Sequence, residues 1–280
     1  MLARLGKDRG DLPKRGTLGK ILKANGVQRT PELERVVNIP RRVYTDEEKA
    51  ELQDLLSDGL KLPGGTMRLN PIQASALADL HDFGGLFAPI RVGGGKTLIS
   101  MLAPIVLDAE RPLLLVPAKL IEKTWREFGK LAAHWPLHPF GLIYIYERIG
   151  REILAAIAPD LLILDECQKV KNPRAAVTRR VARWMKENPE TRMAALSGTI
   201  TQRSLKDFAH IVAWCLPQHA PVPLRYNELV DWSLAIDEKL PAGQERRQAG
   251  ALSQLYNEEE EALALTDPVS AVRRAYGRRL

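Results

Sequence analysis

The sequence predicts an α/β fold in which helices cover both faces of a parallel β-sheet. Between residues 66 and 217, short apolar runs alternate with amphipathic helical segments, which is the pattern of successive β-α-β units. The two polar motifs that carry most of the predicted chemistry each follow an apolar run directly. Sheets of this class bind ligands at the carboxyl ends of their strands, so the position of these motifs indicates the same fold.

Five short apolar runs are predicted to be strands, because runs of this length alternate with longer helical segments. The strands comprise residues 85–90, 112–116, 141–145, 160–164 and 192–196. Six segments with helical periodicity are predicted between and beside them. The helices comprise residues 71–81, 96–107, 120–133, 147–156, 174–186 and 204–214.

Two flanking regions differ in composition from the α/β region at 66–217. Residues 1–65 are predicted to form a basic arm followed by a helical lead-in. The first 44 or so residues of the arm are predicted to be poorly ordered, apart from a short helix at 18–24. Thr45 and Glu48 predict the capping box that opens this lead-in helix. Residues 218–280 predict a helical, partly loose extension without a second sheet. It ends in four arginines that we interpret as a solvated basic tail: Arg273, Arg274, Arg278 and Arg279.

Composition excludes several classes of protein. No run reaches the ~18 apolar residues of a membrane span, and no secretory signal precedes the arm, so we expect no membrane partner and a cytoplasmic or nucleoid-associated location. Cys167 and Cys215 are too few for a disulfide framework or a zinc cluster. The 41 Lys and Arg exceed the 34 Asp and Glu, and this net charge of +7 favours a polyanionic partner such as nucleic acid.

A glycine-rich loop between a strand and a helix predicts a phosphate site. Gly93, Gly94 and Gly95 let the backbone wrap a phosphate, with N–H groups pointing inward at the helix start. Lys96 would reach the β and γ phosphates of a nucleotide, and the Thr97 hydroxyl would bind magnesium. An ordinary glycine turn with a solvated lysine is the alternative for this segment taken alone.

A second motif, 69 residues after Lys96, is an apolar strand ending in two carboxylates, Asp165 and Glu166. At the end of a strand, Asp165 would hold magnesium and Glu166 would act as general base for the attacking water. A strand leaving the core into a charged turn is common, but a preceding phosphate loop favours the nucleotide site.

Three weaker segments add to these motifs. Asn70 and Pro71 predict a helix start, and the amide of Gln73 would read an adenine edge. The hydroxyls of the Ser197-Gly198-Thr199 turn would sense the γ-phosphate region or bond to the Asp-Glu pair. The strand and helix that contain Trp125, Glu127 and Phe128 would present backbone N–H groups to a nucleic-acid phosphate.

Taken in order, these segments resemble the Swi/Snf type of superfamily-two helicase-like ATPases. The similarity covers Leu69 to Pro217 in five motifs. They read LNPIQ at 69–73, VGGGKT at 92–97, LLLVPAKLIEKTWREF at 113–128, LLILDECQKVKNP at 161–173 and LSGTITQRSLKDFAHIVAWCLP at 196–217.

The resemblance implies a RecA-like P-loop NTPase domain over 66–217, ATP and Mg²⁺ as cofactors, and hydrolysis stimulated by nucleic acid. It implies that Gln73 reads adenine and that Gln168 couples hydrolysis to Ser197 and Thr199. Duplex DNA bound without sequence specificity is the expected partner, since no base-reading pattern is visible. Cys167 occupies a variable position of its motif, and we interpret it as a buried structural residue.

The sequence departs from the family at Arg91, usually acidic, and at Ile200, usually proline. The family also needs a second RecA-like domain, and the 63 residues after Pro217 are too few to form one. We therefore expect this domain in cis or in trans, and expect weak ATP binding and slow turnover without it.

Two other functions stay open on the sequence. One is a different class of P-loop NTPase, such as a ring ATPase, against which the Ser-Gly-Thr turn and its trailing helix argue. The other is a non-catalytic module that binds nucleic acid. The basic arm (residues 7–29) and the cluster Arg174, Arg179, Arg180 and Arg183 are phosphate-contact candidates for either function. Ordinary solvated faces explain them equally well.

Overall fold

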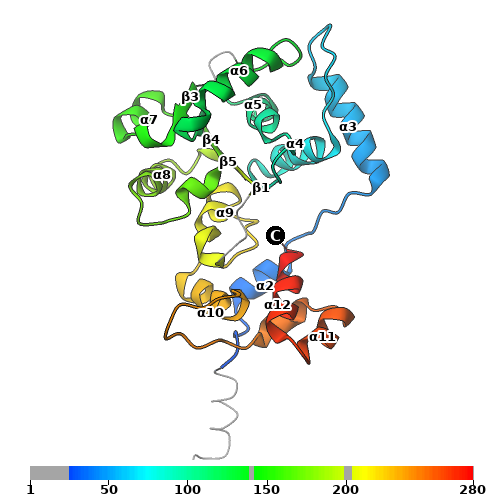
Figure 1. The fold of residues 1–280 in the computed structure, drawn as a ribbon, viewed down its shortest axis with the longest axis vertical. Coiled ribbons are helices and arrows are strands. Elements are labelled where there is room, and N and C mark those ends of the chain that lie inside the picture. Colours follow the sequence, from blue (N-terminus) through cyan, green and yellow to red (C-terminus); the bar gives the residue numbers. More distant parts are fainter. Residues whose placement is uncertain (1–24, 139–141, 199–203, 280) are drawn as a thin grey trace, which may run out of the picture. The chain divides into compact units, whose positions relative to one another are not determined.

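A computed structural model describes residues 25–138, 142–198 and 204–279 of the chain. The chain divides into two compact units, drawn in Figure 1. The sheet unit comprises residues 40–202 and 206–224, and the helical unit comprises residues 1–39, 203–205 and 225–280. Among the described helices, none is long and apolar enough to cross a membrane.

The sheet unit contains five parallel strands in the order β1-β5-β4-β2-β3. Each predicted strand is confirmed to within a residue or two. The strands are β1 Leu86–Pro89, β2 Pro112–Val116, β3 Leu142–Ile145, β4 Leu161–Asp165 and β5 Arg192–Ser197. Residue 141, the predicted first residue of the third strand, lies outside the described residues.

Six α-helices follow or precede these strands near the predicted positions. They are α4 Pro71–Phe83, α5 Lys96–Val106, α6 Ile121–Leu131, α7 Arg151–Ile157, α8 Ala176–Glu187 and α9 Ala209–Cys215. Two of them begin four or five residues later than predicted, because a short 3-10 turn precedes each. These turns are η4 Tyr146–Arg148 before α7 and η6 Leu205–Asp207 before α9.

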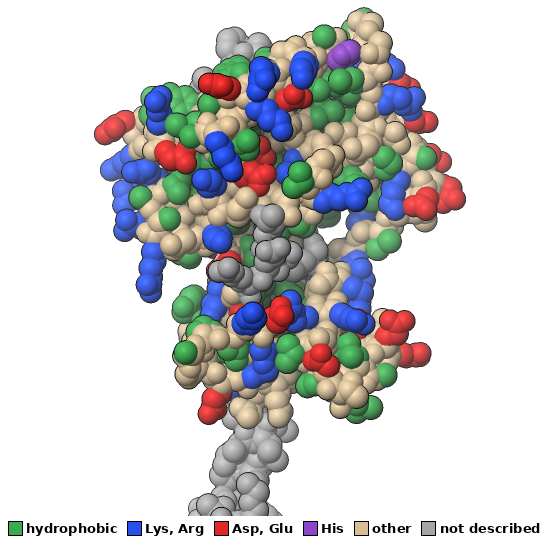
Figure 2. All heavy atoms as spheres, viewed as in Figure 1, with side chains coloured by type: hydrophobic (Ala, Val, Ile, Leu, Met, Phe, Trp, Pro, Cys, Tyr) green, Lys and Arg blue, Asp and Glu red, His purple; other side chains and the backbone are tan. Residues whose placement is uncertain are grey.

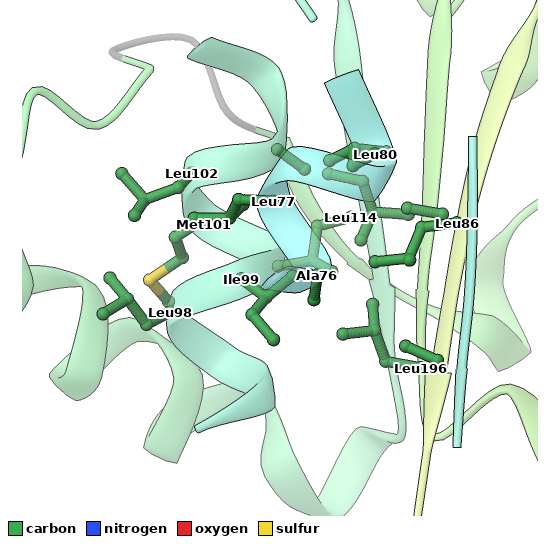
Figure 3. Close-up of a cluster of buried hydrophobic side chains, with 14 of the residues drawn as sticks. Ala76, Leu77, Leu80, Leu86, Leu98, Ile99, Met101, Leu102, Leu114 and Leu196 are labelled. Carbon is green, nitrogen blue, oxygen red and sulfur yellow. The ribbon is translucent and has the colours of Figure 1, made fainter. Parts of the chain in front are cut away.

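The sheet is buried on both faces, as its nearly continuous apolar strands predicted. On one face Leu114 belongs to the main hydrophobic cluster, while Leu113 and Leu115 point the other way and are also buried. Figure 3 shows side chains of α4 and α5 interdigitating against β1, β2 and β5. The loops at the carboxyl edge of the sheet therefore extend from strands that are packed on both faces.

The predicted capping box before the lead-in helix is confirmed. The Thr45 side chain accepts from the Glu48 backbone, and Glu48 accepts from the Thr45 backbone, at the start of α3 Asp46–Leu60. This helix packs against α4, with Leu52, Leu56 and others against the main cluster. The lead-in therefore belongs to the sheet unit, and the unit boundaries at 39/40 and 224/225 differ from the predicted 65/66 and 217/218.

The helical unit joins segments from both ends of the sequence. Its helices are α2 Pro31–Val37, α10 Tyr226–Ile236, α11 Glu258–Ala264 and α12 Pro268–Gly277, with the 3-10 turn η7 Gly250–Leu255. Gly26 pairs with Gln248 in a parallel bridge, and Thr30 donates to Glu228 at 2.6 Å. Trp232 and Tyr276 meet edge to face in the core of this unit.

Two expectations for these flanking regions need correction. Residues 25–39 are an integral part of the helical unit instead of a loose arm, because Leu33 and Val36 of α2 are fully buried. The terminal arginines are not simply solvated: Arg273 pairs with Glu238, and Arg278 with Glu260, which is buried. The short helix predicted at residues 18–24 lies outside the described residues.

Helix α9 is tied through His210 to the 3-10 turn η5 Cys167–Val170, which follows β4. Nε2 of His210 lies 2.8 Å from the carbonyl oxygen of Val170. Since a carbonyl only accepts, this nitrogen carries the proton and donates. Burial lowers the pKa of His210 below its ordinary value of 6.5, although the bond to Val170 and the charge of Asp207 oppose the change.

We expect acidification to destabilise the fold through His210. Its folded-state pKa lies below the unfolded value of 6.5, so its contribution is complete above that pH and is lost as the pH falls below it. Urea unfolding between about pH 8 and pH 5 should show a smaller loss of stability for His210→Gln, whose amide can still donate to Val170. An equal loss in both proteins would rule out this role. His81→Gln, at an exposed site, serves as the control.

Candidate nucleotide-binding site

The strand register brings three of the predicted motifs to one edge of the sheet. Pro89, the last residue of β1, pairs with Ser197 at the end of β5, and Asp165 at the end of β4 pairs with Leu196. Strand β5 lies between β1 and β4. The glycine-rich loop, the Ser-Gly-Thr turn and the carboxylate pair therefore leave three adjacent strands at the same level.

The glycine-rich loop requires glycine at its key positions. Gly93 and Gly95 have φ values of +83° and +81°, in the left-handed region that residues with a Cβ avoid. A Cβ on Gly95 would lie 2.1 Å from Nε2 of Gln73, and one on Gly94 would lie 2.3 Å from Cγ2 of Ile90. Gly95 caps α5, so its backbone turn exposes the first N–H groups of that helix. This geometry fits a bound phosphate.

Lys96 begins α5 and is largely buried, with 9% of its surface exposed. Its Nζ donates to the carbonyl oxygens of Ile90 at 3.2 Å and Arg91 at 3.4 Å. The ammonium group is therefore held inside the loop, at the start of a helix whose dipole favours negative charge. A phosphate bound in the loop would interact favourably with both the ammonium group and the positive end of the helix dipole.

The side chain of Gln73 links α4 to this loop. Its Oε1 accepts from the backbone of Asn70 at 2.7 Å, which completes the capping box of α4, and its Nε2 donates to the Gly95 carbonyl at 3.2 Å. The helix start predicted at Asn70 and Pro71 is confirmed. Each bond leaves the amide one further hydrogen or lone pair, so the oriented amide keeps a donor and an acceptor for a base edge.

Replacing Gln73 with alanine should destabilise the sheet unit by about 1 kcal/mol, because half of a capping box is lost. It should also weaken ATP binding, because the bond that orients the glycine-rich loop at Gly95 is lost with it. Urea unfolding and ATP titration measure the two effects. Asn70→Ala is the control: it removes the cap but keeps the Gln73–Gly95 bond, so an equal loss of ATP affinity would exclude the second effect.

Asp165 and Glu166 form an anionic pair at the end of β4. The pKa of Asp165 is raised to about 6, chiefly by burial and then by the charge of Glu166, while Lys96 opposes the change. At neutral pH Asp165 is therefore still mostly ionised. Glu166 has φ of +56°, a strained backbone for a residue with a side chain and one that concentrates at functional sites.

A hydrogen-bonded chain runs from the Ser-Gly-Thr turn to the carboxylate pair. Oγ of the fully buried Ser197 donates to Oε1 of Gln168 at 2.5 Å, and Nε2 of Gln168 donates to Oε2 of Glu166 at 2.6 Å. Gln168 and Ser197, for which the resemblance implies a coupling role, are therefore in direct contact, and the coupling itself stays a prediction. Gly198 lies against the glycine-rich loop, with Val92 3.3 Å from the position of an added Cβ. Thr199 lies outside the described residues.

A cleft of ≈ 590 Å³ opens over these groups, and we call it the glycine-loop cleft. Its lining includes seven of the predicted site residues: Gln73, Gly93, Gly95, Lys96, Thr97, Asp165 and Glu166. Gly94, Gln168, Ser197 and Gly198 are not part of the lining. Gln168 contacts Glu166 of the lining, and Ser197 contacts Gln168.

Several residues of the cleft were not predicted. Arg68 and Lys123 line it from the segment before α4 and from α6, as does Glu127, which was predicted only as part of a helix facing nucleic acid. Tyr146, fully buried, donates from its hydroxyl to the Asp165 carbonyl at 2.9 Å and so fixes the end of β4. Tyr146 follows an apolar run without any polar pattern around it, so nothing in the sequence marked this role.

The oxygen atoms around the cleft suit a magnesium ion that is held only in part by protein side chains. Among the described residues, no group of three or more His, Cys, Asp or Glu side chains could hold a metal ion. Thr97, Asp165 and Glu166 line the cleft with oxygen atoms. Magnesium is usually bound by one or two carboxylates and completed by water and substrate phosphates. The residues therefore fit a metal that enters with a nucleotide.

The remaining candidates lie outside this cleft. Trp125 is about half exposed on α6 and meets Phe128 edge to face, and the contact of this helix with nucleic acid stays a prediction. Cys167 is buried and unpaired, as interpreted from the sequence.

A search against protein-family models found no match, and a search of curated proteins found none either.

Proposed function

We propose that this chain binds Mg²⁺–ATP in the glycine-loop cleft, as the first half of a DNA-dependent ATPase of the Swi/Snf type. The sheet unit would be a RecA-like domain, and a second such domain, in cis or in trans, would couple hydrolysis to movement on duplex DNA. One observation carries the proposal: Gln73, Lys96, Asp165 and Glu166, predicted from three separate segments, line one cleft.

Each residue of the cleft has a distinct task under this proposal. Lys96 and the N–H groups at the start of α5 neutralise phosphate charge. Thr97 and Asp165 provide oxygen ligands for magnesium, and the oriented amide of Gln73 contacts the base. Bound ATP supplies the phosphoanhydride bond that water cleaves.

Glu166 is the group suited to accept the proton of the attacking water. Its carboxylate is held by Gln168, which is held in turn by Ser197 at the end of β5. A displacement of Ser197 would therefore change the orientation of Glu166, the proposed general base. This series of hydrogen bonds supports a coupling between the state of the cleft and the segment that follows β5.

The proposal predicts ATP binding without fast turnover. An arginine contributed by a second domain can be worth ~10³–10⁵ in rate. In the described part of the tail, residues 204–279 form helices and no strand of a second sheet. The terminal arginines Arg273 and Arg278 are engaged by Glu238 and Glu260 within the helical unit.

The test is calorimetric titration of the chain with ATP, with magnesium and with EDTA, followed by hydrolysis assays with and without duplex DNA. We expect magnesium-dependent ATP binding and slow hydrolysis. A chain that binds no ATP under either condition would overturn the proposal. Fast hydrolysis stimulated by DNA would contradict the need for a second domain while keeping the ATPase.

A further inference from the structure

A second cavity in the sheet unit is lined mainly by arginines. It has a volume of ≈ 260 Å³ and lies between α7 and α8, and it shares no lining residue with the glycine-loop cleft. We call it the arginine cavity. Its lining comprises Arg151, Leu154, Ala176, Arg179, Arg180, Arg183, Trp184 and Glu187.

The positive charges around this cavity are not neutralised within the protein. Across the described part of the chain, the four arginines form no ion pair with a carboxylate, and Arg180 donates only to the Ile149 carbonyl at 3.2 Å. Glu187 is the one carboxylate of the lining. Arg179 and Arg183 are one helical turn apart on α8, where like charges repel each other.

Half of the other arginines that the structure describes behave differently. Nine of them lie within 4.0 Å of a carboxylate: Arg29, Arg35, Arg42, Arg68, Arg111, Arg225, Arg247, Arg273 and Arg278. What distinguishes the arginine cavity is that four arginines outside these ion pairs line one hollow. Figure 2 shows Lys and Arg side chains gathered along the left edge, where Figure 1 draws α7 and α8.

The walls of the cavity suit a ligand that is anionic but also large. Leu154 is buried at its base, and the half-buried ring of Trp184 is fixed by a bond from Nε1 to Thr191 at 3.2 Å. The arginine side chains are exposed around this apolar floor. Guanidinium groups bind phosphate through two parallel N–H donors. Arg179 and Arg183 are separated by a rise of about 6 Å along α8, so they can contact successive groups of a linear polyanion.

We propose that the arginine cavity binds the phosphate backbone of a nucleic acid. This inference rests on the proposed function, for which it names the face that contacts DNA, but it does not involve the residues that bind ATP. Because the two sites share no lining residue, DNA and ATP can be bound together. Contacts to phosphate carry no sequence information, so binding is independent of sequence.

The experiment is fluorescence anisotropy of a labelled duplex DNA with the full chain over a series of salt concentrations. The double variant Arg179→Gln/Arg183→Gln should bind about tenfold or more weakly, and its salt slope should fall by about 1.8, for two lost phosphate contacts. The matched control is Arg148→Gln/Lys186→Gln, which removes the same charge from the turn before α7 and from α8, outside the lining. It should bind almost as well as the unchanged chain.

Equal losses in the two double variants would overturn the proposal, since general charge would then explain binding. Absence of DNA binding by the unchanged chain would also overturn it, as would tight binding of pyrophosphate alone at this cavity. ATP titration of the same variants separates this result from the proposed function. If the double variant Arg179→Gln/Arg183→Gln loses DNA binding but keeps its ATP affinity, the arginine cavity is supported. If the unchanged chain binds DNA through the arginine cavity but binds no ATP, only the proposed nucleotide site is overturned.

Discussion

Lys96→Ala should weaken ATP binding by at least ~30-fold, because removing one partner of a buried charge contact costs about 2–5 kcal/mol. Lys96 is the one lysine at the start of α5, and its ammonium lies inside the glycine-rich loop on the carbonyls of Ile90 and Arg91. Without it, bound phosphates would face Asp165 and Glu166 with less positive charge to separate them. Calorimetric titration with Mg²⁺–ATP measures the loss.

The control for this variant is Lys49→Ala. Lys49 lies on α3, pairs with Asp46 and is not part of the cleft lining. It should leave ATP affinity unchanged. If Lys96→Ala bound ATP as well as the unchanged chain, the glycine-rich loop would be a structural turn, and the non-catalytic module would become the better account of the sheet unit.

Gly85→Ala should destabilise the sheet unit by about 3 kcal/mol or more, which is at the upper end of overpacking effects. Gly85 immediately precedes β1, and a Cβ there would lie 1.9 Å from the carbonyl oxygen of Cys215 and 3.1 Å from that of Met193. Both atoms belong to backbone, at the end of α9 and in β5. Neither can yield without moving a whole element, so the start of β1 would have to shift.

Urea unfolding compares this variant with Gly129→Ala, in the last turn of α6, where an added Cβ meets nothing within 4 Å. Alanine there should stabilise the protein by about 0.5–1 kcal/mol, because glycine is a poor helix former. The two substitutions add the same methyl group, so opposite signs would isolate the contact with Cys215. Similar effects at both positions would show that β1 tolerates displacement.

Some features of this site depend on contacts that short-range patterns do not contain. Gln73 reaches Gly95 across 22 residues, and Ser197 reaches Gln168 across 29. The motifs predicted which residues matter, but their partners follow from the strand order β1-β5-β4, which no single segment encodes. The same reason explains why Tyr146 was missed, since its hydroxyl serves a carbonyl 19 residues away.

The sequence by itself determined the five strands, the helix starts at Thr45 and Asn70, the glycine-rich loop and the carboxylate pair. These features depend on periodicity, capping and backbone freedom, which act within a few residues. Only the tertiary structure decided that residues 25–39 join the tail in one helical unit and that Arg151 lies beside the arginines of α8. Such arrangements come from burying apolar faces of distant segments together, and apolar burial is not directional, so local sequence cannot specify which segments will meet.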